Sequence, residues 1–235
     1  MVFTLVRINF TPEEAIEAIP SVIQCLESYD ITTVRASIGS FLLARWINEN
    51  TDIKVLLNRD GSDEIACGYL YNYYAPSAQD AHEDALRLLS EIHMYDGLRV
   101  DRTISHHGIE ARVPFLDTRY VDAYLNILVE WRVPNKFQME KQFLHDVFNE
   151  FYPGILPREV LYRRKEAFSD GVSSKNETKS MIDYIKDFTN GKEADVYKEI
   201  FTELFPNNLH IIPRYWIPKW TDETNDPSAT KLKIY

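Results

Sequence analysis

The sequence contains no apolar run close to the roughly 20 residues that a helix needs to cross a bilayer, so we expect no membrane-spanning segment. Basic charge is also in deficit, with 26 Lys and Arg against 36 Asp and Glu and a net charge of −10. Because nucleic-acid binding needs a basic surface, this balance argues against a nucleic-acid partner.

Cysteine and glycine are both scarce. Cys25 and Cys67 form no CxxC pair and no metal-ligand spacing, so we interpret them as reduced core thiols of a cytoplasmic protein. The segment Met1–Phe10 has no small-residue cleavage site, and we expect no secretory signal. The eight glycines include no GxxxxGKS or GxxxxGKT phosphate loop, and no residue is a certain metal ligand.

The rest of the composition is typical of a folded protein. Of 235 residues, 45% are hydrophobic and 13% aromatic, which is enough to build a core. We expect one domain over residues 1–205. The prolines at Pro206, Pro213, Pro218 and Pro227 predict an extended C-terminal tail over residues 206–235.

Helix-start signals recur along the chain. The sequence Thr11-Pro12-Glu13-Glu14 predicts a helix with Thr11 as its cap, kinked or split at Pro20. We expect further helices from Thr32 or Thr33 to Asn48, from Ser77 to Arg99, from Asp117, over Met139–Glu150 and from Pro157.

One short segment, Lys54–Leu57, predicts a buried strand. A polar loop, Asn58–Ser62, follows it, and Asp63 begins another expected helix. This order predicts an α/β fold with a parallel sheet, in which ligands bind at the carboxyl ends of the strands. Because one strand cannot form a stable sheet, we expect further strands within Phe3–Ile8 or outside the chain.

Several segments of the chain together resemble a known family. They are Tyr29–Ser37, Asn58–Glu64, His93–Asp96 with Arg99, Gly108–Asp117, Met139–Lys141, Arg164–Gly171, Tyr215–Trp220 and Asn225–Ala229. From about Phe10 onward, their order and spacing are similar to those of the synthetase domain of glutamine-dependent asparagine synthetases, particularly the eukaryotic type.

The resemblance implies a fold and a reaction. The fold is an incomplete PP-loop ATP pyrophosphatase sheet, of the adenine nucleotide α-hydrolase-like type, with a mostly helical C-terminal region. The implied substrates and cofactors are aspartate, ATP and Mg²⁺. In the family, the β-carboxylate of aspartate is activated as β-aspartyl-AMP, and ammonia from an N-terminal glutaminase domain displaces AMP.

The resemblance also implies residue roles. Cations are needed where a carboxylate meets a polyphosphate, and hard oxygen ligands suit Mg²⁺. The implied catalytic residues are Asp60, Arg35 and Lys165; the ATP-binding residues are Asn58, Arg59 and Gly61; the substrate-binding residues are Thr32 and Arg35; and the residue for the metal or pyrophosphate is Asp63.

Each residue also has an ordinary structural interpretation. Loop Arg and Lys side chains are mostly solvated, and Asp30 or Thr32 is a helix cap. Asp63 and Glu64 are first-turn charges of a helix. The set Glu110, Arg112 and Asp117 forms ion pairs, and His106 and His107 are ordinary helix or loop residues.

The chain departs from the family pattern in three places. Val2 follows Met1 where the family has its glutaminase cysteine, and the SGG-x-DS phosphate loop expected upstream of Thr11 is absent. In the loop that reads SGEGSDE in the family, Arg59 replaces a glycine and Asp60 replaces a longer glutamate. A displacement of about 1 Å in a catalytic group costs on the order of 100-fold in rate.

Two functions follow from these observations. The first is a truncated part of an asparagine synthetase that is inactive alone and acts with a separate N-terminal half or as a homo-oligomer. The second is a non-catalytic, degenerate relative that binds another protein or is a remnant. The motifs from Thr32 to Gly171 favour the first, and the Asn58-Arg59 change favours the second.

Overall fold

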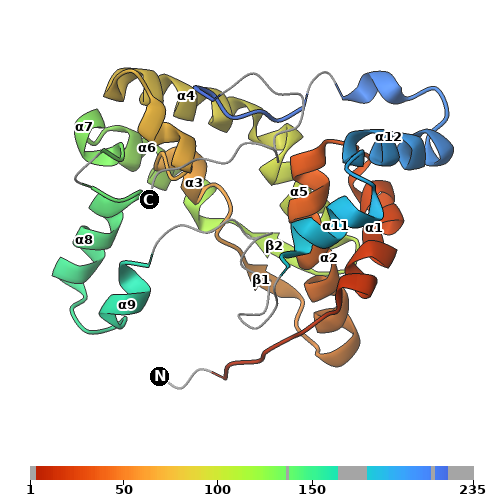
Figure 1. Cartoon of the computed structure of the whole chain (residues 1–235). Coiled ribbons are helices and arrows are strands. Elements are labelled where there is room, and N and C mark those ends of the chain that lie inside the picture. The colour runs from red at the N-terminus through yellow and green to blue at the C-terminus, as the bar shows by residue number, and fades with distance from the viewer. Residues whose placement is uncertain (1–3, 136–137, 164–178, 213–214, 222–235) are drawn as a thin grey trace. The chain divides into compact units, whose positions relative to one another are not determined.

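The computed structural model describes residues 4–135, 138–163, 179–212 and 215–221 (Figure 1). These residues form two compact units. Unit 1 holds the described residues within Met1–Leu56, Leu98–Arg112 and Ala167–Trp216. Unit 2 holds those within Leu57–Gly97, Val113–Glu166 and Ile217–Tyr235.

Helices dominate both units. Unit 1 contains α1 (Pro12–Leu26), α2 (Ile31–Asn50), most of α5 (Asp96–Ser105), β2 (Glu110–Arg112), α11 (Met181–Phe188), α12 (Glu193–Leu204) and η4 (Leu209–Ile211). Strand β1 (Val55–Leu57) ends at the boundary. Unit 2 contains α3 (Ser62–Ile65), η1 (Leu70–Tyr74), α4 (Ala78–Glu91), η2 (Ile92–Met94), η3 (Pro114–Leu116), α6 (Thr118–Leu125), α7 (Val129–Arg132), α8 (Gln142–Phe151) and α9 (Arg158–Leu161).

The first helix, α1, begins as the sequence predicts. The Thr11 hydroxyl accepts a hydrogen bond from the Glu14 amide, and the Glu14 carboxylate accepts one from the Thr11 amide, which forms a capping box. Pro20 does not split the helix, which is a correction to that alternative. Its side chain is exposed, so the ring meets solvent rather than the core.

The core of unit 1 lies between α1, α2 and α12 (Figure 1). Val34, Ile38 and Phe41 of α2 are buried there with Tyr197 and Phe201 of α12. Asp30 caps α2 by accepting a hydrogen bond from the Thr33 amide at 2.8 Å. The sequence therefore placed α2 correctly, whereas α11 and α12 had no individual prediction.

The two strands pair as a small parallel sheet, β1 beside β2. The prediction that Lys54–Leu57 is buried is wrong, because Val55 is 51% exposed and Leu57 is 75% exposed. Within the described residues only β2 pairs with β1, and a strand with a single neighbour is covered poorly. The apolar composition of the strand therefore does not correspond to burial in this chain.

The helices of unit 2 follow the predicted starts more closely than the predicted ends. Ser77 caps α4 and Asp117 caps α6, as expected, and α9 begins after Pro157. The single helix expected to reach Arg99 is wrong, because α4 ends at Glu91 and η2 follows. Helix α8 begins at Gln142, three residues later than predicted, because Lys141 has a left-handed backbone with φ 60°.

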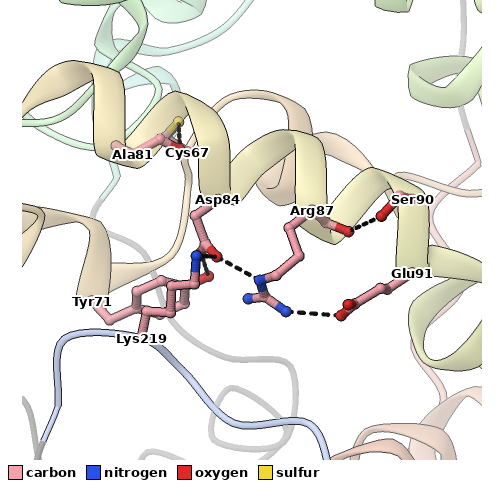
Figure 2. A network of polar contacts seen from close by, with 8 residues as sticks. All are labelled: Cys67, Tyr71, Ala81, Asp84, Arg87, Ser90, Glu91 and Lys219. Atoms are coloured by element: carbon pink, nitrogen blue, oxygen red, sulfur yellow. Dashed lines mark hydrogen bonds and ion pairs between the residues drawn. The ribbon is translucent and has the colours of Figure 1, made fainter.

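A network of polar contacts joins α4 to η1 and to the segment of Lys219 within unit 2 (Figure 2). Fully buried Asp84 accepts hydrogen bonds from the Tyr71 hydroxyl at 2.7 Å and from Arg87 Nε at 2.7 Å. Lys219 Nζ lies 3.1 Å from the same carboxylate, and Trp220 packs against the apolar cluster of Cys67, Ala81, Ala85 and Val133. The segment that contains these two residues is thus joined to the rest of unit 2 by an ion pair and by apolar packing, which includes a ring contact between Trp220 and Tyr71.

No helix of the described ranges is both long and apolar enough to cross a membrane.

In unit 1, Leu209, Ile212 and Tyr215 pack on the core, although they lie within the predicted 206–235 tail. The division of the chain at residue 205 stays a prediction.

Candidate functional site

The loop after β1 has a defined conformation. The Asp60 amide donates a hydrogen bond to Asn58 Oδ1 at 2.9 Å, and Arg59 is exposed. Gly61 has φ 89°, and a Cβ at this position would lie 2.3 Å from Leu116 Cδ2. Only glycine fits both the backbone and the space, so Gly61 fixes the path of the loop.

The loop leads to Asp63, whose carboxylate has a lysine partner. Lys141 Nζ donates to Asp63 Oδ1 at 2.6 Å, and the side chains are 15% and 18% exposed. A Cβ on Gly68 would lie 2.3 Å from the same oxygen, so the backbone at Gly68 approaches the carboxylate closely. The sequence identified Asp63 as a site residue but gave no role to Lys141.

A buried carboxyl group follows Asp63. Glu64 is 2% exposed and accepts a hydrogen bond from the Tyr69 hydroxyl. Burial raises the pKa of Glu64 well above its ordinary value, and the neighbouring Asp96 raises it further. Sequence reasoning missed this group, although Glu64 and Asp96 both lie in segments that carry the family resemblance.

Two other predicted site residues, Thr32 and Arg35, lie on α2 of unit 1. Thr32 is partly exposed and Arg35 is buried. Arg35 Nε donates to Glu193 Oε1 at 2.6 Å, and a second nitrogen, Nη2, donates to Oε2. The guanidinium is therefore held by a carboxylate of the neighbouring helix α12.

The structure groups some of the predicted residues and not others. Asn58–Gly61 and Asp63 lie together in unit 2, whereas Thr32 and Arg35 belong to unit 1. Lys165 lies outside the described residues. Of the ordinary interpretations, Asp30 is the cap of α2 and Thr32 is not. Glu110 pairs with Arg112, but Asp117 pairs with Arg119.

The residues around Asp63 are suited to one mode of metal binding. The described part of the chain has no group of three or more His, Cys, Asp and Glu that could hold a metal. Mg²⁺ commonly uses one or two carboxylates together with substrate phosphates and water. The carboxylate oxygens of the partly exposed Asp63 fit that mode. The described residues do not provide a complete set of protein ligands for a metal ion.

Comparison with known proteins identifies the class to which the fold and motifs belong. The chain matches the family described as asparagine synthase over residues 3–89 and 75–228. It is 42% identical over 250 residues to the glutamine-hydrolyzing asparagine synthetase of Gallus gallus and 42% identical over 248 residues to that of Mesocricetus auratus. The Homo sapiens enzyme is 40% identical over 248 residues. Each alignment covers 97% of this chain and 44% of the relative.

These matches extend over nearly the whole chain at well above 30% identity. The chain therefore belongs to the asparagine synthase family, which confirms the resemblance carried by its motifs. It spans about 44% of the length of the curated relatives that it matches.

Proposed function

We propose that this chain is the part of an asparagine synthetase that activates aspartate with Mg-ATP, giving β-aspartyl-AMP and pyrophosphate before amination. The observation that carries the proposal is the Asn58–Asp63 loop, which turns at Gly61 and presents a partly exposed carboxylate beside Lys141. Bound Mg²⁺ would offset charge on the phosphates. The similarity to glutamine-hydrolyzing asparagine synthetases supports the reaction class.

The roles proposed for the site residues follow from charge and position. Asn58, Arg59 and Gly61 form the edge that contacts ATP, and Asp60 supports formation of the acyl-adenylate. Asp63 takes part in holding Mg²⁺ with pyrophosphate, and Lys165 offsets phosphate charge. On α2, Thr32 donates a hydrogen bond to an aspartate oxygen and Arg35 offsets the substrate charge.

We propose further that the chain needs a partner for the complete reaction. The relatives are more than twice as long as the segment that they share with this chain. The partner in the proposal is a polypeptide equivalent to the unmatched part of those relatives, which supplies ammonia and the remaining phosphate contacts. A homo-oligomer is the other arrangement that could complete the site.

The test is aspartate- and Mg-dependent exchange of labelled pyrophosphate into ATP. The chain is assayed alone and with the part of the Gallus gallus enzyme that the alignment leaves unmatched, expressed separately. We expect exchange in the mixture, and we expect Asp63→Asn and Lys165→Ala to abolish it. The control is Lys179→Ala, which removes a lysine whose Asp187 partner is 64% exposed. If folded chain and partner show no exchange at any ratio, the enzyme proposal is wrong.

A second candidate function is that of a non-catalytic binding module. The observation that favours it is the Arg35–Glu193 ion pair, since a buried bidentate partner competes with any substrate for the guanidinium. Affinity capture separates the two proposals when the chain is immobilised and the unmatched part of the Gallus gallus enzyme is applied. Binding without pyrophosphate exchange supports the module, and binding with exchange supports the enzyme.

A further inference from the structure

In the ion pair between Lys141 and Asp63, the surrounding structure restricts both side chains. The two residues are far apart in sequence, and their charged atoms lie 2.6 Å apart. Both side chains are largely shielded, at 15% and 18% exposure. By contrast, the Lys179–Asp187 pair of unit 1 has the same 2.6 Å separation but side chains that are 51% and 64% exposed.

On the carboxylate side, Gly68 restricts Asp63. The Gly68 amide donates a hydrogen bond to the Asp63 carbonyl at 2.8 Å. A Cβ at Gly68 would lie 2.3 Å from Oδ1 and 3.0 Å from the Asp63 Cα. The backbone therefore turns back against the carboxylate, and the room available to Asp63 depends on a residue without a side chain.

On the lysine side, the backbone is strained and anchored. Lys141 has φ 60° and ψ 20°, a left-handed conformation that is unfavourable for a residue other than glycine. The preceding residue, Glu140, is 1% exposed and accepts a hydrogen bond from the Tyr73 hydroxyl at 2.9 Å. This anchor holds the turn in which Lys141 extends to Asp63 just before α8 begins.

The charges of the pair discriminate between two forms of magnesium. A free Mg²⁺ ion approaching Asp63 meets the repulsion of the Lys141 ammonium, which already offsets the carboxylate. A magnesium–polyphosphate complex is anionic overall, so the same ammonium attracts it while Asp63 provides a hard oxygen to the metal. The ion pair is therefore matched to the complex rather than to the bare ion.

We propose that Lys141 is a positioning and specificity-determining residue, which orients Asp63 and favours magnesium carried by a polyphosphate over free magnesium. This inference rests on the proposed function. It gives a role to Lys141, to which the proposed function assigns none. A purely structural ion pair would fasten the loop before α8, and its loss would weaken every ligand of the site equally.

Calorimetric titration of the full chain with two probes, MgCl₂ alone and magnesium pyrophosphate, tests the proposal. For Lys141→Met we expect magnesium pyrophosphate to bind about tenfold more weakly, because one charge-assisted contact is lost. Binding of free Mg²⁺ should be unchanged or stronger. Lys141→Arg, which keeps the charge, should retain most of the affinity, and Lys179→Met is the control with an equally short pair.

Each outcome of the titrations has a distinct meaning. Equal weakening of both probes by Lys141→Met, or none, overturns the role of Lys141 and leaves the proposed function standing. A folded wild-type chain that binds no magnesium pyrophosphate, either alone or mixed with the partner polypeptide, contradicts the proposed function and this inference together. If Lys141→Met fails to fold by urea titration, Lys141→Gln gives the same comparison, because it keeps a donor to Asp63 without the charge.

Discussion

Arg35 and Glu193 form a bidentate ion pair in the interior of unit 1, with side chains only 6% and 3% exposed. The pair joins α2 to α12, whose next turn contributes Tyr197 to the same core. Burial raises the pKa of the Tyr197 phenol well above its ordinary value, and the nearby Glu193 carboxylate raises it further. Two charges so enclosed depend on each other, because neither can be solvated alone.

We predict that breaking this pair on one side destabilises the protein strongly. Glu193→Leu leaves the Arg35 guanidinium buried without its partner, and should lower the free energy of unfolding by about 3–5 kcal/mol. Arg35→Met should have a similar effect. The double variant Arg35→Met/Glu193→Leu should lose much less than the sum, because no unpaired charge remains. Urea unfolding of the four proteins measures this coupling, and additive losses would contradict it.

The same pair shows what the sequence could predict and what it could not. The helix starts at Thr11, Ser77 and Asp117 were predictable because each cap and its partner lie within a few residues. The partnership of Arg35 with Glu193 spans 158 residues, and no local pattern encodes it. Long-range pairing therefore decided the environment of a residue for which the family resemblance implied a substrate contact.

The candidate site was predictable to a similar extent. The loop from Asn58 to Asp63 is contiguous, so its residues could be recognised together and placed after a strand. Lys141 lies 78 residues from Asp63, and its segment was recognised without a role. The position of the strand was predicted correctly and its burial was not. Apolar residues indicate that a strand can pack against other elements, but they do not show whether other elements cover it.

We predict that Asp84 stabilises unit 2 in a pH-dependent way. Burial alone would raise the pKa of this carboxyl, but hydrogen bonds from Arg87, Tyr71 and Lys219 together hold it below the ordinary value of 3.8. Asp84→Asn removes the charge that these donors share, and should cost about 2–4 kcal/mol at pH 7. Urea unfolding of wild type and variant across pH 2–7 provides the measurement.

The sign of the pH dependence follows from the lowered pKa of Asp84. The folded state binds this proton less readily than the unfolded state, so the stabilisation is fully present above the unfolded pKa. It is lost as pH falls through the folded pKa. The difference in free energy of unfolding between wild type and Asp84→Asn should therefore become smaller below pH 3.8. A gap that stays constant down to pH 2 would show that the charge of Asp84 is not what stabilises the network.

We predict that Gly61→Ala destabilises unit 2 for two separable reasons. The left-handed backbone, φ 89°, costs about 1 kcal/mol with any side chain, and contact with Leu116 adds about 1–2 kcal/mol. Gly154→Ala is the control, because Gly154 has φ 78° and nothing within 4 Å of an added Cβ. Thermal unfolding should show a larger loss at Gly61 than at Gly154. When Leu116 is also replaced by Ala, the loss of stability from Gly61→Ala should fall to that of Gly154→Ala.

We predict, finally, that neither cysteine reacts in the folded protein. Both are buried and free, and burial raises the pKa of the Cys25 thiol to about 11 and that of Cys67 to about 12. Alkylation requires the thiolate, so iodoacetamide at pH 8 should label each at least roughly 100-fold more slowly than an exposed thiol. Glu17→Cys places a comparison thiol on the exposed face of α1. In urea all thiols should react alike, and rapid labelling of Cys67 in the native chain would mean that its surroundings open.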